Sequence, residues 1–200
     1  MSGNIIRSID TGRYVPAHLS FGVDHSLWAF GWQRDASDPA YPDRKDHLTL
    51  RKYSPDGKEI RGYLWRSMFP AGMEPGSYHW QERRITVTSD RVGIEALSGI
   101  NSGQREWVEL DLSGNVVGRW RLDRSYRFPG VVFTADNRAY VQRFDEASKS
   151  PQVLRLNHDK SQWELVKSPP NAALYVSDGD KLVFSDGSGG AMHMSWYSQP

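Results

Sequence analysis

The chain has 200 residues, a formal net charge of +1 at pH 7 and no cysteine. The lack of cysteine excludes disulfides, thiolate zinc sites and a cysteine nucleophile, and the mixed, nearly balanced charge gives no electrostatic basis for binding nucleic acid or an anionic membrane. The sequence shows no run of about 18 apolar residues and no basic-then-apolar leader, so we expect neither membrane insertion nor a signal peptide, and the compartment stays undefined.

A strand–turn–strand pattern recurs four times along the chain. In each copy an apolar-alternating run ends in aspartate, and a second apolar or aromatic run follows the turn. The four aspartates are Asp24, Asp90, Asp136 and Asp178. Aspartate at a turn accepts hydrogen bonds from the backbone two residues further on, so we interpret these residues as turn formers. Repeats of roughly 40–65 residues built from short strands are typical of radial β-folds.

A second kind of turn lies between these copies. Ser2-Gly3, Asp56-Gly57 and Ser113-Gly114 are followed by apolar runs, and glycine at such positions tolerates the positive φ of a tight hairpin. A degenerate copy of this turn lies around His158-Asp159-Lys160. Further strands precede three of the turns, at residues 47–53, 106–112 and 152–156. Each unit therefore predicts four antiparallel strands, named a to d in chain order, with tight a–b and c–d turns.

The fold class that follows is all-β, a β-propeller of four-stranded antiparallel blades within one domain, residues 1–200. The four blade units span residues 17–65, 83–122, 129–167 and 171–200. The last unit lacks strand d, and the chain opens on a surplus strand of that kind at residues 3–10. We expect Asn4–Ile9 to pair with Ala191–Tyr197, because that pairing removes two exposed edges. The four blade equivalents form either a small closed ring or part of a larger ring.

Three stretches carry a resemblance to a known family: residues 53–59, 112–117 and 133–138. They resemble blades of bacterial six-bladed propellers of the NHL-like type. The resemblance covers nearly the whole chain but is one of scaffold, turn plus strand. It implies a propeller fold, and relatives on such scaffolds include binding modules and metal-dependent lactonases or lyases. No catalytic residue set of those relatives matches this chain residue by residue.

Strand connectivity separates two faces of the predicted propeller. The a–b and c–d turns share one side and are short, whereas the b–c loops and d–a crossovers share the other side, the loop face. Two long segments, residues 33–46 and 66–83, and a shorter basic crossover, residues 121–129, belong to the loop face. Connections longer than about 12 residues are uncommon and tend to be functional or disordered.

Aromatic and arginine side chains in these segments are of the types that dominate interface hot spots. We therefore expect a protein, peptide or glycan partner to bind there. The candidate binding residues are Tyr41, Arg44, Tyr78, His79, Trp80, Arg124, Tyr126 and Arg127. A competing interpretation is that Met68, Phe69 and Trp80 fold back and plug the channel, which is a packing role.

Other patterns favour packing over chemistry. Trp28, Phe30 and Trp32 share one face of a strand, and so do Met192, Met194 and Trp196, which predicts core packing in both places. The aspartates of residues 35–46 could offer oxygen ligands to calcium, but their spacing matches no calcium loop. We therefore predict no metal and no cofactor.

A non-catalytic binding module is the function that the sequence favours. The alternative is a lactonase-like hydrolase or lyase with a metal- or histidine-centred site at the channel mouth. Such an enzyme needs inward carboxylates or histidines in several blades. His18 is the only titratable group of the inner strands. The other side chains that these strands offer are small hydroxyl or apolar ones: Ser20, Thr86, Thr88, Thr134 and Val176. We accordingly predict no catalytic residue.

Overall fold

The computed structural model describes residues 8–33, 47–69, 73–74, 85–98, 105–122, 130–186 and 192–198. These residues form four antiparallel sheets and one short 3-10 helix, η1 (Arg66–Met68), and no α-helix occurs among them. The prediction of an all-β fold is confirmed.

Sheets 1 and 2 come from the first part of the chain. Sheet 1 contains β1 (Tyr14–Phe21), β2 (Leu27–Gln33), β3 (Leu48–Tyr53) and β4 (Glu59–Trp65). Sheet 2 contains β6 (Ile85–Val87), β7 (Arg91–Ser98), β8 (Arg105–Asp111) and β9 (Val116–Leu122), and β5 (Met73–Glu74) adds to β7. Each is a meander in the predicted a-to-d order.

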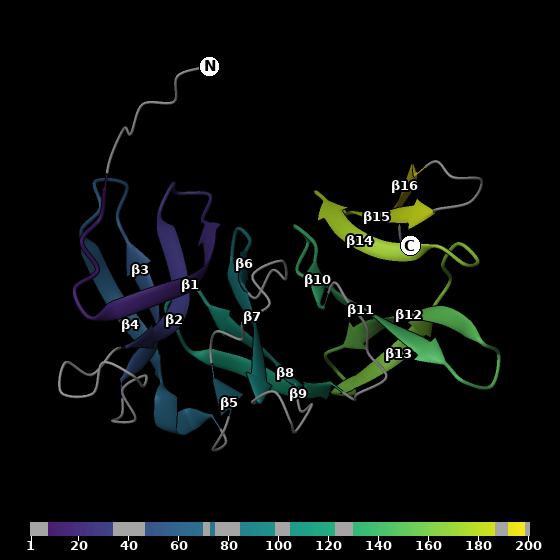
Figure 1. The fold of residues 1–200 in the computed structure, drawn as a ribbon, viewed down its shortest axis with the longest axis horizontal. Coiled ribbons are helices and arrows are strands. Elements are labelled where there is room, and N and C mark those ends of the chain that lie inside the picture. Colours follow the sequence, from purple (N-terminus) through teal and green to yellow (C-terminus); the bar gives the residue numbers. More distant parts are fainter. Residues whose placement is uncertain are drawn as a thin grey trace.

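Sheets 3 and 4 follow in the same order. Sheet 3 contains β10 (Val132–Phe133), β11 (Ala139–Asp145), β12 (Ser150–Asn157) and β13 (Gln162–Val166). Sheet 4 contains β14 (Ala173–Asp178), β15 (Lys181–Asp186) and β16 (His193–Ser198). The sheets succeed one another along an open arc, with sheets 1 and 4 at its ends, and the described residues form no closed ring (Figure 1).

Consecutive sheets pack face to face. Because side chains alternate between the two faces of a strand, a sheet whose strands are apolar on both faces can be covered on both sides. Trp28, Phe30 and Leu50 of sheet 1 pack against Ile94 and Val108 of sheet 2, which confirms the packing role predicted for Trp28 and Phe30. Two further clusters join sheets 2 and 3 and sheets 3 and 4 in the same way.

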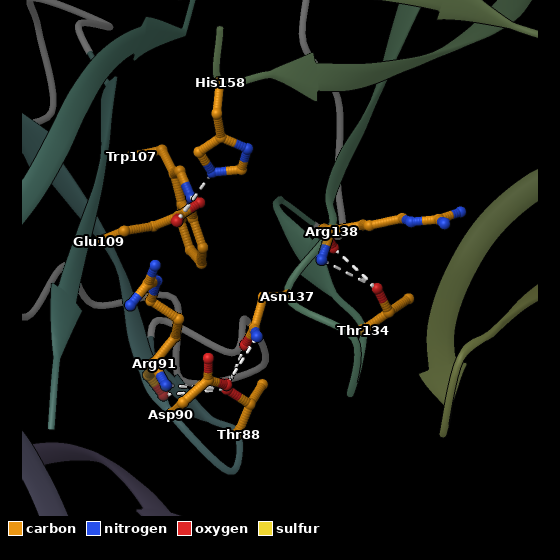
Figure 2. A network of polar contacts seen from close by, with 9 residues as sticks. All are labelled: Thr88, Asp90, Arg91, Trp107, Glu109, Thr134, Asn137, Arg138 and His158. Carbon is orange, nitrogen blue, oxygen red and sulfur yellow. Dashed lines mark hydrogen bonds and ion pairs between the residues drawn. The ribbon is translucent and has the colours of Figure 1, made fainter.

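The tight-turn edges of neighbouring sheets are joined by side-chain hydrogen bonds. Ser20 Oγ accepts a bond of 3.2 Å from the Val87 N–H, and Ser177 Oγ donates one of 2.9 Å to the Phe133 carbonyl. Between sheets 2 and 3, Thr88 Oγ1 donates to Asn137 Oδ1 at 2.6 Å, and Asn137 Nδ2 donates to Asp90 at 2.6 Å (Figure 2). Inner-strand hydroxyls are therefore used to fasten the sheets together.

The repeated aspartates are turn residues, but they are not equivalent. Asp24 Oδ1 accepts from the Ser26 N–H at 3.1 Å, as predicted. The turn at Asp90 closes between Thr88 and Arg91, one residue tighter than the turn between Thr134 and Arg138. Alignment on the aspartates is therefore wrong by one position, and the structural counterpart of Tyr140 is Gly93 rather than Ile94.

The two ends of the chain differ from the prediction where they are described. Residues 8–10 form no strand, and Ile9 packs against Tyr14, Ala29 and Tyr53 on sheet 1. Residues 1–7 lie outside the described ranges. Core packing is wrong for Met192, Met194 and Trp196, which are exposed because no described sheet covers their face of sheet 4.

Candidate functional site

All eight candidate binding residues lie outside the described residues, but the ends of their segments are described. Tyr41 and Arg44 belong to residues 34–46, which leave sheet 1 after Gln33 and return at His47. The other six belong to segments that leave and return at sheet 2 or at the start of sheet 3. Where these ends lie decides whether the candidates can act together.

The crossover into sheet 2 is not a plain loop. It begins with η1 and then forms β5, which pairs with β7 at Leu97 and Ser98, while β6 pairs with the same edge of β7 at Val92, Gly93 and Ile94. Residues 75–84 therefore leave and rejoin sheet 2 within three residues of β7, a span of about 10 Å. This excursion carries Tyr78, His79 and Trp80.

One cross-strand row of sheet 2 anchors three segments. Glu74 pairs with Leu97, Leu97 pairs with Arg105, and Arg105 pairs with Leu122. We call these four residues the loop row. Residues 75–84 start at it, residues 99–104 start and end beside it, and residues 123–129 start from it. Six of the eight candidates thus belong to segments anchored at one place: Tyr78, His79, Trp80, Arg124, Tyr126 and Arg127.

Arg105 of the loop row forms a buried ion pair with Glu95, on the face of sheet 2 that packs against sheet 3. The Glu95 side chain is fully buried, and the guanidinium of Arg105 donates to it. The second carboxylate oxygen of Glu95 accepts from the Val131 N–H at 3.3 Å. A Cβ on Gly130, which has a φ of +99°, would collide with this oxygen. Glu95 therefore fixes the backbone at Gly130 and Val131, where the described chain enters sheet 3.

A second arginine holds the first crossover on the side of sheet 1. Arg119 Nη1 donates to the Met68 carbonyl at 3.0 Å and to Glu106 at 3.2 Å, and its guanidinium lies 5.1 Å from the centre of the Phe69 ring. Phe69 is buried against Phe30. Phe69 is therefore a packing residue, but the described residues form no closed ring whose channel it could plug. Met68 is exposed, and Trp80 lies outside the described residues.

A further buried carboxylate lies nearer the tight-turn edge. Glu109 accepts from Trp107 Nε1 at 2.8 Å and is 2.9 Å from Nε2 of His158 in the next sheet (Figure 2). Its neighbours across both strands are Gly93 and Gly118. The carboxylate is fully buried, so it contacts protein groups and acts as a joint between sheets 2 and 3.

The buried hydroxyl of Tyr14 is also structural. Tyr14 Oη lies 2.7 Å from the Ala29 carbonyl and 2.9 Å from the Thr49 carbonyl, which share its one donor hydrogen, and burial raises the pKa of this hydroxyl above its ordinary value. Within the described ranges, no group of three histidine, aspartate or glutamate side chains could hold a metal ion. Across the same segments, no helix reaches the length and hydropathy that a membrane span requires.

Sequence reasoning missed the loop row and the residues beneath it. Its visible sign is Glu95, a charged residue within the otherwise apolar stretch from Val92 to Leu97. The pairing of β5 and the partners of Arg105 depend on contacts between distant segments, so no local pattern reveals them.

Comparisons with known proteins assign no family. No protein-family model matches the chain, and no curated protein matches it. Among solved structures, the chain is similar to a protein of unknown function from Bacteroides caccae, with 12% sequence identity and a TM-score of 0.45. The similarity covers 93% of this chain and 62% of that protein.

Proposed function

We propose that this protein is a non-catalytic binding module on a single-domain, NHL-like β-propeller scaffold, and that its loop face holds a protein, peptide or glycan partner. One observation carries the proposal, which is that residues 75–84, 99–104 and 123–129 are all anchored at the loop row. The opposite edge is closed by tight turns that are bonded to one another. Rigid support at one edge and long segments at the other are the usual arrangement of a binding scaffold.

The support under the loop row favours recognition because it limits the freedom of the segment ends. Glu95 with Arg105 holds one crossover, and Arg119 with Glu106 holds the other. Fixing the ends before a partner arrives lowers the conformational entropy lost on binding. The aromatic and arginine residues of the segments suit a partner that offers flat apolar or sugar surfaces together with acidic groups.

Trp80→Ala tests the proposal. Wild-type protein is screened on a glycan array and on an array of acidic peptides, and the best ligand is titrated by calorimetry. Removal of an anchoring tryptophan costs about 2 kcal/mol or more, so we expect at least a roughly 30-fold weaker Kd. Leu165→Ala, an exposed apolar site on β13, serves as the control and leaves Kd unchanged.

Two results would contradict the proposal. An unchanged Kd combined with a melting temperature several degrees lower would assign Trp80 to packing. Turnover of a panel of lactones by the wild-type protein, with no array ligand, would favour the hydrolase or lyase alternative.

A further inference from the structure

The two ends of the arc carry exposed apolar faces. On sheet 1 the outward face includes Leu19 and Phe21, which are 55% and 72% exposed. On sheet 4 the outward face includes Met194 and Trp196, which are 39% and 55% exposed. Large apolar side chains gathered in this way mark an interaction site more often than isolated ones do.

The equivalent positions of the inner sheets are buried on the preceding sheet. Leu19 pairs with Ala29 as Ile85 pairs with Ile94, and Ile85 is only 4% exposed. Phe21 pairs with Leu27 as Phe133 pairs with Ala139, and Phe133 is only 2% exposed. Near its tight turns the outward face of sheet 1 is therefore built like the faces that sheets 2 and 3 turn toward their predecessors. Beside it, Ala29 and Tyr53 are already covered by Tyr14 and Ile9.

The outward face of sheet 4 shows the opposite correspondence. Ser185 pairs with Met194 as Glu95 pairs with Trp107 and as Gln142 pairs with Val153. Trp107 and Val153 are 2% and 0% exposed, because each packs toward the following sheet. Sheet 4 thus offers the face that sheets 2 and 3 cover with the next sheet.

We propose that sheet 4 of one copy of this chain packs on sheet 1 of a second copy, head to tail. The contact continues the series of three sheet-to-sheet interfaces already present within the chain. Each copy carries both halves of this interface, one at each end of the arc, so a second copy supplies the face that each end lacks. Two polar side chains on these faces are paired within the chain, since Arg51 bonds Glu59 at 2.8 Å and Trp196 Nε1 bonds Asp178 at 3.0 Å.

A head-to-tail contact is heterologous, which makes it testable by complementation. Sedimentation equilibrium from about 1 to 100 μM should show wild-type protein associating to dimers or larger assemblies. Phe21→Glu and Trp196→Glu break opposite halves of every junction, so each variant alone should be monomeric. Mixed in equal amounts, they should form dimers again, because one intact sheet 4 face meets one intact sheet 1 face. Leu165→Glu, on an exposed site away from both ends, should associate like the wild type.

Three results would overturn the inference. A wild-type protein that stays monomeric over the whole range would show that the ends meet within one chain or await another partner. If Phe21→Glu still dimerises while Trp196→Glu does not, the contact is between two copies of sheet 4. If the mixture stays monomeric, the two faces do not complement each other. Circular dichroism confirms folding first, and Phe21→Ser and Trp196→Gln replace any variant that unfolds.

Discussion

Glu95 and Gln142 occupy the same position in neighbouring sheets and hold the backbone of the following sheet with opposite polarity. Glu95 lies three residues after Val92 and Gln142 three after Ala139, two residues that pair equivalently with their inner strands. The Glu95 carboxylate accepts from the N–H of Val131, and Gln142 Nε2 donates to the carbonyl of Ala172 at 2.9 Å. Both partners immediately precede the first strand of the next sheet.

This relationship predicts that Gln142→Glu destabilises the protein at neutral pH. The new carboxylate would face the Ala172 carbonyl, and a buried acceptor without a donor costs about 1–3 kcal/mol. Below the ordinary glutamate pKa of about 4.3 the protonated carboxyl can donate, so part of the loss should return. Urea unfolding at pH 7 and pH 4 measures the difference. Gln142→Met, similar in length and unable to bond, controls for the lost bond, and equal stability of all three proteins would contradict the prediction.

Glu109 and His158 should be energetically coupled across sheets 2 and 3. Glu109→Ala leaves the buried Trp107 N–H without its acceptor, so we expect a loss of about 1–3 kcal/mol in the free energy of unfolding. A double-mutant cycle with His158→Ala should give an interaction energy above about 0.5 kcal/mol. His193→Ala, an exposed histidine on β16, should cost little. Strict additivity of the two changes would show that the 2.9 Å contact contributes nothing.

Gly114 and Gly179 form a matched pair that separates backbone strain from steric fit. Both have positive φ, +88° for Gly114 and +63° for Gly179. A Cβ on Gly114 would overlap the Tyr63 ring, whereas a Cβ on Gly179 would have no other atom within 4 Å. Gly179→Ala should therefore cost about 1–2 kcal/mol from the left-handed backbone alone. Gly114→Ala should cost clearly more, because the ring of the preceding sheet must move. Thermal melts of the two variants decide, and similar melting temperatures would be contrary to the structure.

Asp24 should make a small contribution to stability that is lost in acid. The Ser26 hydroxyl first, and then Lys52, lower the pKa of this carboxyl below its ordinary value of 3.8. A lowered folded-state pKa stabilises the protein above the ordinary pKa, and the gain disappears as the pH falls through the folded-state pKa. The urea midpoints of wild type and Asp24→Asn should therefore differ more at pH 7 than at pH 2.5. The effect is small because the side chain is more than half exposed, and a difference that grows in acid would refute it.

The strand pattern could be predicted from the sequence because it is local. Alternating apolar residues and turn residues such as Asp24 and Gly114 act within a few positions of the chain, and they determine each four-stranded meander. The long segments of the loop face could be recognised for the same reason. The one-residue difference between the turns at Asp90 and Asp136 could not, because a turn's length is set by its closing hydrogen bond.

The packing of the sheets was decided only by the tertiary structure. The alternation of apolar residues shows which face of its sheet Trp28 or Trp196 lies on, but not whether another sheet covers that face. Trp28 is buried and Trp196 exposed because one lies inside the arc and the other at its end. Likewise, the pairing of β5 with β7 and of Arg105 with Glu95 joins distant segments into the loop row. Sequence alone determined which segments carry the candidate residues, and contacts between sheets determined that six of them share one anchor.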